Sequence, residues 1–385
     1  MQIRIPAVFM RGGTSKAVFF HQNHLPSDPD IRDRVILAAY GSPDPNRRQM
    51  DGMGGSLSTN SKVAIISPSK DPGYDVVYHF GQVSIDRPFV DYKGNCGNIS
   101  AAVGPFAIDE GLVEAVEPVT EVKIYQKNTN KLITAEVPVK DGRHDPAGEY
   151  AIQGVPGTGS RINLRFDDPA GSVTGKLFPT GNLLDTIEIP HKGNVNLTIV
   201  DAGNPWVLVP AAELDLIGTE IDEIDQSEEI RAKLEAIRSR AAVLIGLASS
   251  PAEASRRSQS IPKIAFLSAP RQYETVDGQL IKTDQIDMVA RVMSMGALHK
   301  ALAVSCAVAA AGAAAVSGTI MDSILDPAQS GQDQFRLGHP GGVFEVSSLI
   351  EKNGEDYKYV EASFGRTARR LMEGYVLVPE DCFKY

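Results

Sequence analysis

The stretch GNCGNISAAVGPFAI, residues 94–108, decides the fold. From Gly97 onward its residues are small or apolar on every side, and a helix without a polar face is one that other elements surround. Runs typical of strands lie before it, at 63–66 and 75–80, and after it, at 122–125, 132–135 and 162–166. The sequence therefore predicts a sheet curled around a central helix, with Pro105 kinking that helix or ending its first segment. An earlier helix is expected to open with Ser27 and Asp30 as a capping box and to close at Gly41.

The second half of the chain repeats this plan. A strand at 195–200 and an amphipathic helix that begins at Ser227 precede a strand at 263–267. After Ser294-Met295-Gly296 we expect an alanine-rich helix, again apolar all round, with its first N–H groups at Gly296 and Ala297. We predict an α/β (α+β) fold of two similar domains, residues 1–183 and 184–385. Each has a curled β-sheet around a central helix, and the last strand is free to cross back to the first domain.

Size and charge exclude several classes of protein. At 385 residues the chain exceeds the size of one ordinary core, which favours two domains. A formal net charge of −10 disfavours nucleic acid or an anionic membrane as a partner, whereas a local pocket can still bind a small anion. The apolar run at 301–316 is shorter than the ~20 residues that a membrane span needs. Three widely spaced cysteines give no disulfide framework and no metal-ligand pair, which fits the reducing cytoplasm.

Two residues are candidates for catalysis. Cys96 precedes the predicted central helix, where unpaired N–H groups and the positive end of the helix dipole favour a thiolate and attract carboxylates. The polar loop 58–61 delivers Lys62 into the apolar strand that follows. A lone cysteine is most often a small buried apolar residue, and a lone lysine is usually solvated. Together, however, the two indicate proton transfer on an acidic substrate.

A series of motifs that runs in order from the first strand to near the last resembles the PrpF-type family. Its members include 2-methylaconitate cis–trans isomerase, methylitaconate isomerase and 4-oxalomesaconate tautomerase. The motifs are Met10-Arg11-Gly12-Gly13-Thr14-Ser15-Lys16, Gln49-Met50-Asp51-Gly52-Met53-Gly54-Gly55, Ser61-Lys62-Val63, Asn95-Cys96-Gly97-Asn98, Pro179-Thr180-Gly181-Asn182, Ser294-Met295-Gly296-Ala297-Leu298-His299, Gly338-His339-Pro340 and Arg366-Thr367-Ala368-Arg369.

The resemblance implies a diaminopimelate-epimerase-like fold of two pseudo-symmetric domains. It also implies an active site in the cleft between them, no cofactor and no metal. In the family, the lysine that matches Lys62 and the cysteine that matches Cys96 lie at the reacting carbon. The isomerisation needs a base that takes an allylic proton from an unsaturated di- or tricarboxylate and donors that hold the resulting dienolate. Lys62 can be that base near neutral pH only if its pKa falls from about 10.4 toward about 7–8.

Racemases and epimerases of this fold use two thiols, one from each domain. The second predicted helix entrance carries Ser294-Met295-Gly296 and no cysteine. Cys306 is expected about ten residues into that helix, roughly 15 Å along it, too far to serve. An amino-acid racemase is therefore disfavoured. The alternative from another class is a non-catalytic carboxylate-binding protein. Lys62 together with Cys96 disfavours it, because simple binding needs donors but no proton carrier.

Several donors are expected to bind the substrate carboxylates. Backbone N–H groups of Gly97 and Asn98 at one helix entrance, and of Gly296 and Ala297 at the other, are the main ones. The full predicted set is Ser15, Asn60, Ser61, Asn95, Gly97, Asn98, Met295, Gly296, Ala297 and His339. Arg366, Arg369 and Arg370 are expected on the surface or in salt bridges. The substrate is expected to be 2-methylaconitate or aconitate, with methylitaconate and 4-oxalomesaconate as alternatives, and a homodimer stays open.

Overall fold

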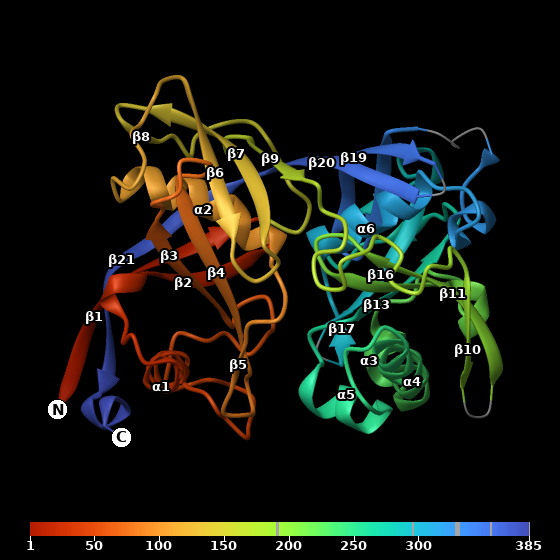
Figure 1. The fold of residues 1–385 in the computed structure, drawn as a ribbon, viewed down its shortest axis with the longest axis horizontal. Helices are drawn as coiled ribbons and strands as arrows, with labels where there is room; N and C mark the ends of the chain where they lie inside the picture. Colours follow the sequence, from red (N-terminus) through yellow and green to blue (C-terminus); the bar gives the residue numbers. More distant parts are fainter. Residues whose placement is uncertain (190–191, 295, 328–331, 355, 385) are drawn as a thin grey trace. The chain divides into compact units, whose positions relative to one another are not determined.

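The chain forms two compact units in the computed structural model (Figure 1), which describes residues 1–189, 192–294, 296–327, 332–354 and 356–384. Unit 1 comprises Met1–Arg165 and Gly365–Tyr385, and unit 2 comprises Phe166–Phe364. The chain thus enters unit 2 before the 183/184 boundary that the sequence favours, and its last strand belongs to unit 1.

Unit 1 is a sheet with one helix on each face. Antiparallel pairs join β21 to β1, β1 to β2, β3 to β4 and β6 to β7, while β2–β3 and β4–β6 are parallel. Its helices and strands are β1 (Gln2–Gly12), β2 (Ser15–His21), α1 (Pro29–Tyr40), β3 (Lys62–Pro68), β4 (Val76–Val83), β5 (Val90–Asp91), α2 (Gly97–Asp109), β6 (Val119–Gln126), β7 (Lys131–Lys140), β8 (Arg143–His144), β9 (Ile162–Asp167) and β21 (Ala368–Pro379). The last two residues of β9 belong to unit 2.

The central helix of unit 1 is confirmed as α2. Every residue from Gly97 to Ile108 is buried, and the helix contacts strands on both sides of it in the sequence, among them β1, β6 and β7. Pro105 lies inside α2, so the helix does not end there, one of the two alternatives that the sequence offered. Packing on all sides stabilises this helix strongly enough to outweigh the one hydrogen bond that a proline removes.

The first helix, α1, packs on the opposite face of the same sheet. Val35 and Tyr40 of α1 share a core with Val63 and Ile65 of β3. The helix ends at Gly41 as predicted, with a left-handed φ of 65°. Its N-cap is Asp28 rather than Ser27, because the Asp28 carboxylate accepts hydrogen bonds from two N–H groups of the first turn.

Unit 2 repeats the arrangement of a sheet between helices. Its helices and strands are β10 (Asp185–Ile189), β11 (Gly193–Asp201), β12 (Pro205–Pro210), α3 (Asp222–Gln226), α4 (Glu228–Leu244), α5 (Pro251–Arg257), β13 (Lys263–Ser268), β14 (Tyr273–Glu274), β15 (Leu280–Ile281), β16 (Met288–Ser294), β17 (Ala297–Leu298), α6 (Val304–Ala314), β18 (Gln334–His339), β19 (Gly342–Asn353) and β20 (Asp356–Arg366), whose last residues belong to unit 1. Ser227 caps α4 as predicted, and all of α6 is buried. Among the helices described here, none is long and apolar enough to span a membrane.

Strands, and not the start of a helix, lie on either side of Gly296: β16 ends at Ser294 and β17 begins at Ala297. Met293 and Leu298 are paired across β16 and β17, and both side chains enter the core beneath α4. Gly296 takes the positive φ of 82° that such a tight turn requires. The alanine-rich helix starts only at Val304, so its first N–H groups are not those of Gly296 and Ala297. The helix starts later than expected because Leu298 packs in the core beneath α4 as part of a strand.

Candidate active site

Lys62 is the first residue of β3, and its side chain is buried on the face of the sheet opposite α1. Its neighbour Val63 packs with α1, and side chains alternate along a strand. Lys62 is 7% exposed, and its Nζ donates a 2.6 Å hydrogen bond to Oε1 of Gln82, the residue that faces it on β4. The ring of Phe80 lies 5.3 Å from Nζ. The amine is therefore held in one position by a neutral acceptor.

The orientation of the Gln82 amide is fixed by the strand end next to it. Its Nε2 donates to the carbonyl of Ser61 at 2.8 Å and to that of Ser58 at 3.1 Å. Both amide hydrogens are thus used, and only Oε1 can face Lys62. The sequence analysis missed Gln82, although an amide within the apolar run VVYHFGQV is a signal that a buried partner exists.

The electrostatic environment of Lys62 affects its protonation. Burial lowers the pKa of the Lys62 amine below its ordinary value, and the charge of Cys96 opposes that shift. A lysine whose pKa falls is deprotonated in a larger share of molecules at neutral pH, and only the neutral amine can accept a proton. The direction of this shift is the one that a basic role for Lys62 requires.

Cys96 is the N-cap residue of α2. Its backbone is extended, its carbonyl accepts from the N–H of Ser100 at 3.0 Å, and its half-buried thiol makes no capping hydrogen bond. Tyr78, on the same face of β4 as Gln82, is fully buried, and its hydroxyl has no hydrogen-bond partner among the described residues. Burial raises the pKa of Tyr78, and the charge of Cys96 raises it further. The charge of Cys96 thus acts on both Lys62 and Tyr78.

Arg366 is buried next to the start of α2, whereas we expected it on the surface or in a salt bridge. It is 6% exposed, and its Nε donates to Oδ1 of Asn98 at 3.2 Å. The N–H of Thr14 donates to the same oxygen at 3.4 Å. Burial lowers the pKa of Arg366 to about 9. Arg370 does lie in salt bridges, with Glu110 and Glu373, as expected.

Of the other predicted residues of unit 1, Asn60, Ser61 and Asn95 lie near Lys62 or Cys96 in the chain, and the Ser61 side chain is already hydrogen-bonded within the protein. Ser61 is fully buried, donates to the carbonyl of Val83 at 3.0 Å and accepts from Nε2 of Gln49 at 2.8 Å. Ser15 is the buried first residue of β2, and Asn95 is buried directly before Cys96. Asn60 is half-buried in the turn that leads into β3, with its N–H bonded to the carbonyl of Leu57.

In unit 2 the predicted residues do not gather at the start of α6. Gly296 and Ala297 are exposed at the β16–β17 turn, and Met295 lies outside the described residues. His339 ends β18, where its Nδ1 accepts from the N–H of Gly341 at 3.1 Å. Within the described part of the chain, no group of three His, Cys, Asp or Glu side chains is arranged to hold a metal ion.

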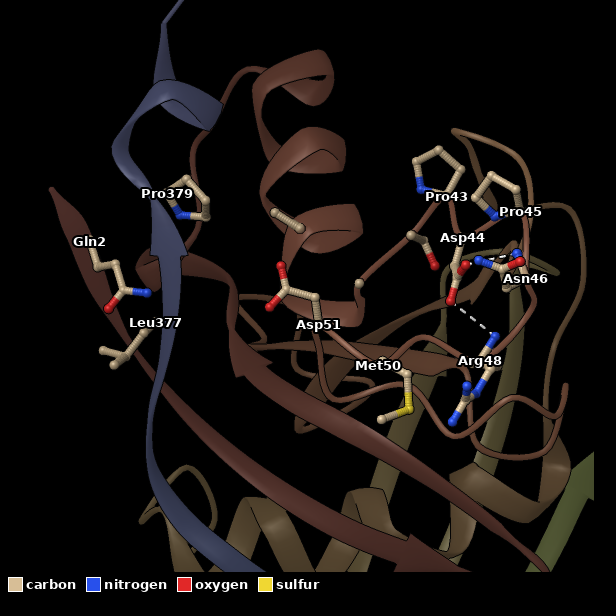
Figure 2. Close-up of a pocket in the computed structure, with 13 residues that line it drawn as sticks. Gln2, Pro43, Asp44, Pro45, Asn46, Arg48, Met50, Asp51, Leu377 and Pro379 are labelled. Atoms are coloured by element: carbon tan, nitrogen blue, oxygen red, sulfur yellow. Dashed lines mark hydrogen bonds between the residues drawn. The ribbon is translucent and has the colours of Figure 1, made fainter.

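Unit 1 also has a pocket of about 550 Å³ beside the end of α1 that contains neither Lys62 nor Cys96 (Figure 2). Asp44 organises its loop by accepting hydrogen bonds from the backbone N–H groups of Asn46, Arg48 and Gln49. Gln49 in turn reaches Ser61. The loop therefore supports the strand end that carries Lys62.

Comparison with known proteins identifies the family. A family model described as PrpF protein matches residues 2–379. The chain belongs to the PrpF family. It is 46% identical over 379 residues to the 3-methylitaconate isomerase of Eubacterium barkeri, covering 98% of each chain. It is 41% identical over 392 residues to the 2-methyl-aconitate isomerase of Shewanella oneidensis, again covering 98% of each.

Solved structures agree with this PrpF assignment. A crystal structure of methylitaconate-delta-isomerase matches with a TM-score of 0.80 and 45% identity, over 100% of this chain and 98% of the other. A hydroxyproline epimerase from Agrobacterium vitis matches in fold, with a TM-score of 0.53 and 14% identity over 97% of this chain and 92% of the other. The predicted epimerase-like fold is confirmed, and this PrpF protein is an enzyme of the isomerase class.

This PrpF chain has no thiol at the N-cap of its second central helix. The N-cap of α6 is Ala303, the position that Cys96 occupies in α2. Cys306 is the third residue of α6 rather than the tenth, so the distance argument against it is wrong. It is nevertheless fully buried, and burial raises the pKa of its thiol. A buried thiol of raised pKa is a poor proton carrier.

Proposed function

We propose that this protein isomerises an unsaturated di- or tricarboxylate by moving an allylic proton, with Lys62 as the base and Cys96 as the second proton carrier. The hydrogen bond from Lys62 to Gln82, together with the lowered pKa of Lys62, is the observation that carries the proposal. A residue that only binds an anion gains from a positive charge, whereas burial here favours the neutral amine.

The proposed reaction starts with the neutral Lys62 amine. Its Nζ takes a proton from the carbon next to the double bond, and the C–H electron pair enters a dienolate conjugated with a substrate carboxylate. A proton then returns to the same carbon, after rotation, or to the far end of the conjugated system. The donor is either protonated Lys62 or the thiol of Cys96; in the second case a proton then passes from the Lys62 ammonium group to the Cys96 thiolate, which restores both residues. No electrons are gained or lost overall, because one proton leaves and one returns.

The dienolate needs hydrogen-bond donors where its charge develops. The N-terminus of α2, which begins at Gly97, carries the positive end of the helix dipole and favours an anion. The buried Arg366 adds a positive charge beside Asn98. We propose that these groups bind the carboxylate that is conjugated to the reacting carbon.

Within this class of acids, two substrates are favoured. The identity of 46% to a 3-methylitaconate isomerase favours methylitaconate, and that of 41% to a 2-methyl-aconitate isomerase keeps 2-methylaconitate beside it. The sequence motif Ser294-Met295-Gly296…His299 resembles the methylaconitate branch of the family, which favours 2-methylaconitate. Both acids are therefore tested.

Proton NMR in deuterated water tests the proposal. The purified protein is incubated with methylitaconate, 2-methylaconitate, trans-aconitate, 4-oxalomesaconate and, as the racemase control, L-proline. We expect a double-bond shift or cis–trans change with deuterium at an allylic carbon for at least one of the acids. Exchange only at the stereocentre of proline would support a racemase, and no exchange with any compound would support a binding protein. Either result would overturn the proposal.

A further inference from the structure

The hydroxyl of Tyr78 is a buried polar group that the proposed reaction does not use. Tyr78 lies on β4 and is fully buried, and its hydroxyl has no hydrogen-bond partner among the described residues. Buried polar groups are nearly always hydrogen-bonded, because an unpaired one has lost its contacts with water without compensation. An unpaired hydroxyl at this place therefore indicates an acceptor that forms only in another state of the protein.

The Tyr78 side chain points to the face of the sheet that α2 covers. Tyr78 is paired with Gln126 of the parallel strand β6, and side chains at paired positions take the same face. Val122, four residues before Gln126, lies on this face as well. A Cβ atom added to Gly104 of α2 would lie 3.7 Å from Cβ of Val122, so α2 packs on this face. Tyr78 and α2 are thus on one side of the sheet of unit 1.

The start of α2 lies at the end of the sheet that carries Lys62. A Cβ atom added to Gly12, at the turn between β1 and β2, would meet the backbone carbonyl oxygen of Asn98. This turn is two residues from Ala17, which faces Lys62. Lys62 in turn faces Gln82 near the end of β4. From this end, α2 runs back over the sheet.

Cys96 and Tyr78 lie at a similar level along the sheet. Gly104, which packs over Val122, is eight residues from Cys96, about 12 Å along the helix. Gln126, the partner of Tyr78, is four residues from Val122, about 13 Å along the strand. Both steps run toward the same end of the sheet. The N-cap of α2 is therefore located over Tyr78 and its neighbours on β4.

The electrostatics agree with this placement. Burial raises the pKa of Tyr78, and the charge of Cys96 raises it further, so the hydroxyl stays protonated and can donate. The charged or titratable groups that we place around Cys96 are Lys62 on β3, Tyr78 on β4 and Arg366 beside the second residue of α2. In the proposed reaction Lys62 moves a proton and Arg366 binds a carboxylate. Tyr78 is left as a donor for the sulfur.

We propose that Tyr78 is a positioning residue, whose hydroxyl donates a hydrogen bond to the sulfur of Cys96 once this residue has given its proton to the dienolate. The inference rests on the proposed function of Cys96 as the second proton carrier. The Cys96 side chain makes no capping hydrogen bond, so rotation about its Cα–Cβ bond can bring the sulfur to the hydroxyl. A hydrogen bond to a charged acceptor is stronger than one to a neutral acceptor, so it favours the thiolate over the thiol. When the Lys62 ammonium group returns a proton to the sulfur, this advantage ends.

Alkylation of Cys96 by iodoacetamide measures how readily its thiolate forms. The thiolate sulfur bonds to the carbon of the reagent and iodide leaves, and the thiolate rather than the thiol is the nucleophile. All proteins carry Cys382→Ser, which leaves Cys96 half-buried and Cys306 fully buried. In Tyr78→Phe, the pH midpoint of the alkylation rate should rise by about one pH unit, a tenfold slower reaction below both midpoints. With an isomerised acid, kcat should fall by about tenfold and KM should change little.

Tyr125→Phe is the matched control, because it removes a hydroxyl of unit 1 that donates to Asn130 on the opposite face of β6. It should leave the midpoint and kcat unchanged. An unchanged midpoint in Tyr78→Phe overturns the proposal, and a rise of KM in its place would make Tyr78 a substrate-binding residue. A shifted midpoint with unchanged kcat overturns it too, since the hydrogen bond would then have no part in turnover.

Folding and activity are checked separately. Removing an unpaired buried hydroxyl should not lower the stability of Tyr78→Phe in urea. A variant that does not fold would show that the hydroxyl has a structural partner, which contradicts the proposal. A protein that isomerises no acid, but whose alkylation midpoint shifts as expected, leaves the hydrogen bond from Tyr78 to the sulfur standing and removes the proposed function.

Discussion

Nζ of Lys62 lies 2.6 Å from Oε1 of Gln82, across the first paired position of β3 and β4. Because the Gln82 amide is fixed by two backbone carbonyls, this contact holds the lysine without giving it a counter-charge. A carboxylate in the same place would keep the lysine protonated. The pairing of a buried lysine with a neutral amide is therefore the feature on which the proposed base role of Lys62 depends.

The first prediction concerns the base itself. Lys62→Ala should lower kcat by at least 10²-fold, the scale at which general acid–base groups contribute, while the circular dichroism spectrum stays that of the wild type. Lys70→Met, at an exposed lysine just beyond the same strand, should retain full activity. Turnover is measured by ultraviolet absorbance of the conjugated acid. A Lys62→Ala variant with more than a tenth of wild-type kcat would show that Lys62 is not essential.

The second prediction uses Gln82 to shift the pH profile. Gln82→Glu places a carboxylate against the Lys62 amine, which favours the ammonium form and raises the pKa of Lys62. The activity at pH 7 should fall at least tenfold, and the rise of kcat/KM with pH should move to higher pH. Gln82→Met is the matched control, since it removes the hydrogen bond without adding charge. Equal profiles for the two variants would contradict the proposed role of Gln82.

The third prediction tests the thiol. Cys96→Ser keeps the size of the side chain but replaces the thiol by a hydroxyl that ionises far less readily, so kcat should fall by about 10²-fold or more. Cys382→Ser changes the half-buried thiol near the end of the chain and should leave kcat unchanged. A loss of only a few-fold in Cys96→Ser would reduce Cys96 to a positioning role.

The fourth prediction concerns stability and pH. The pKa of Lys62 in the folded protein lies below 10.5, its value in the unfolded chain, so in the window between these two values the unfolded chain binds more protons. The free energy of unfolding of the wild type should therefore rise with pH across this window, relative to Lys62→Met, by about 1.4 kcal/mol for each unit of pKa difference.

The measurement is urea unfolding of both proteins at pH values from 6 to 10, spaced about one pH unit apart or less. The hydrogen bond that Gln82 loses in Lys62→Met shifts the two curves apart by a constant amount and leaves the slope unaffected. A stability difference that is flat with pH, or that changes in the opposite direction, would mean that Lys62 is not desolvated in the folded protein.

Much of the fold follows from local patterns. The helix at Gly97 and the alanine-rich helix of the second half are apolar on all sides, and such helices have to be surrounded whatever the topology. Ser227 and Gly41 mark helix ends through side-chain capping and a left-handed backbone, which depend on a few neighbouring residues. For the same reason the family motifs around Lys62 and Cys96 can be recognised in the sequence alone.

The sequence by itself determined the central helices, the candidate base and thiol, and the family, because each of these depends on residues adjacent in the chain. Only the tertiary structure decided that Gln82 holds Lys62, that Arg366 is buried against Asn98, and that α6 starts at Val304 rather than at Gly296. Asn98 and Arg366 are 268 residues apart, and the β16–β17 turn forms because Leu298 enters the core beneath α4. Which strands pair and which face a side chain takes are set by the packing of the whole unit, and these determine the chemical environment of the lysine.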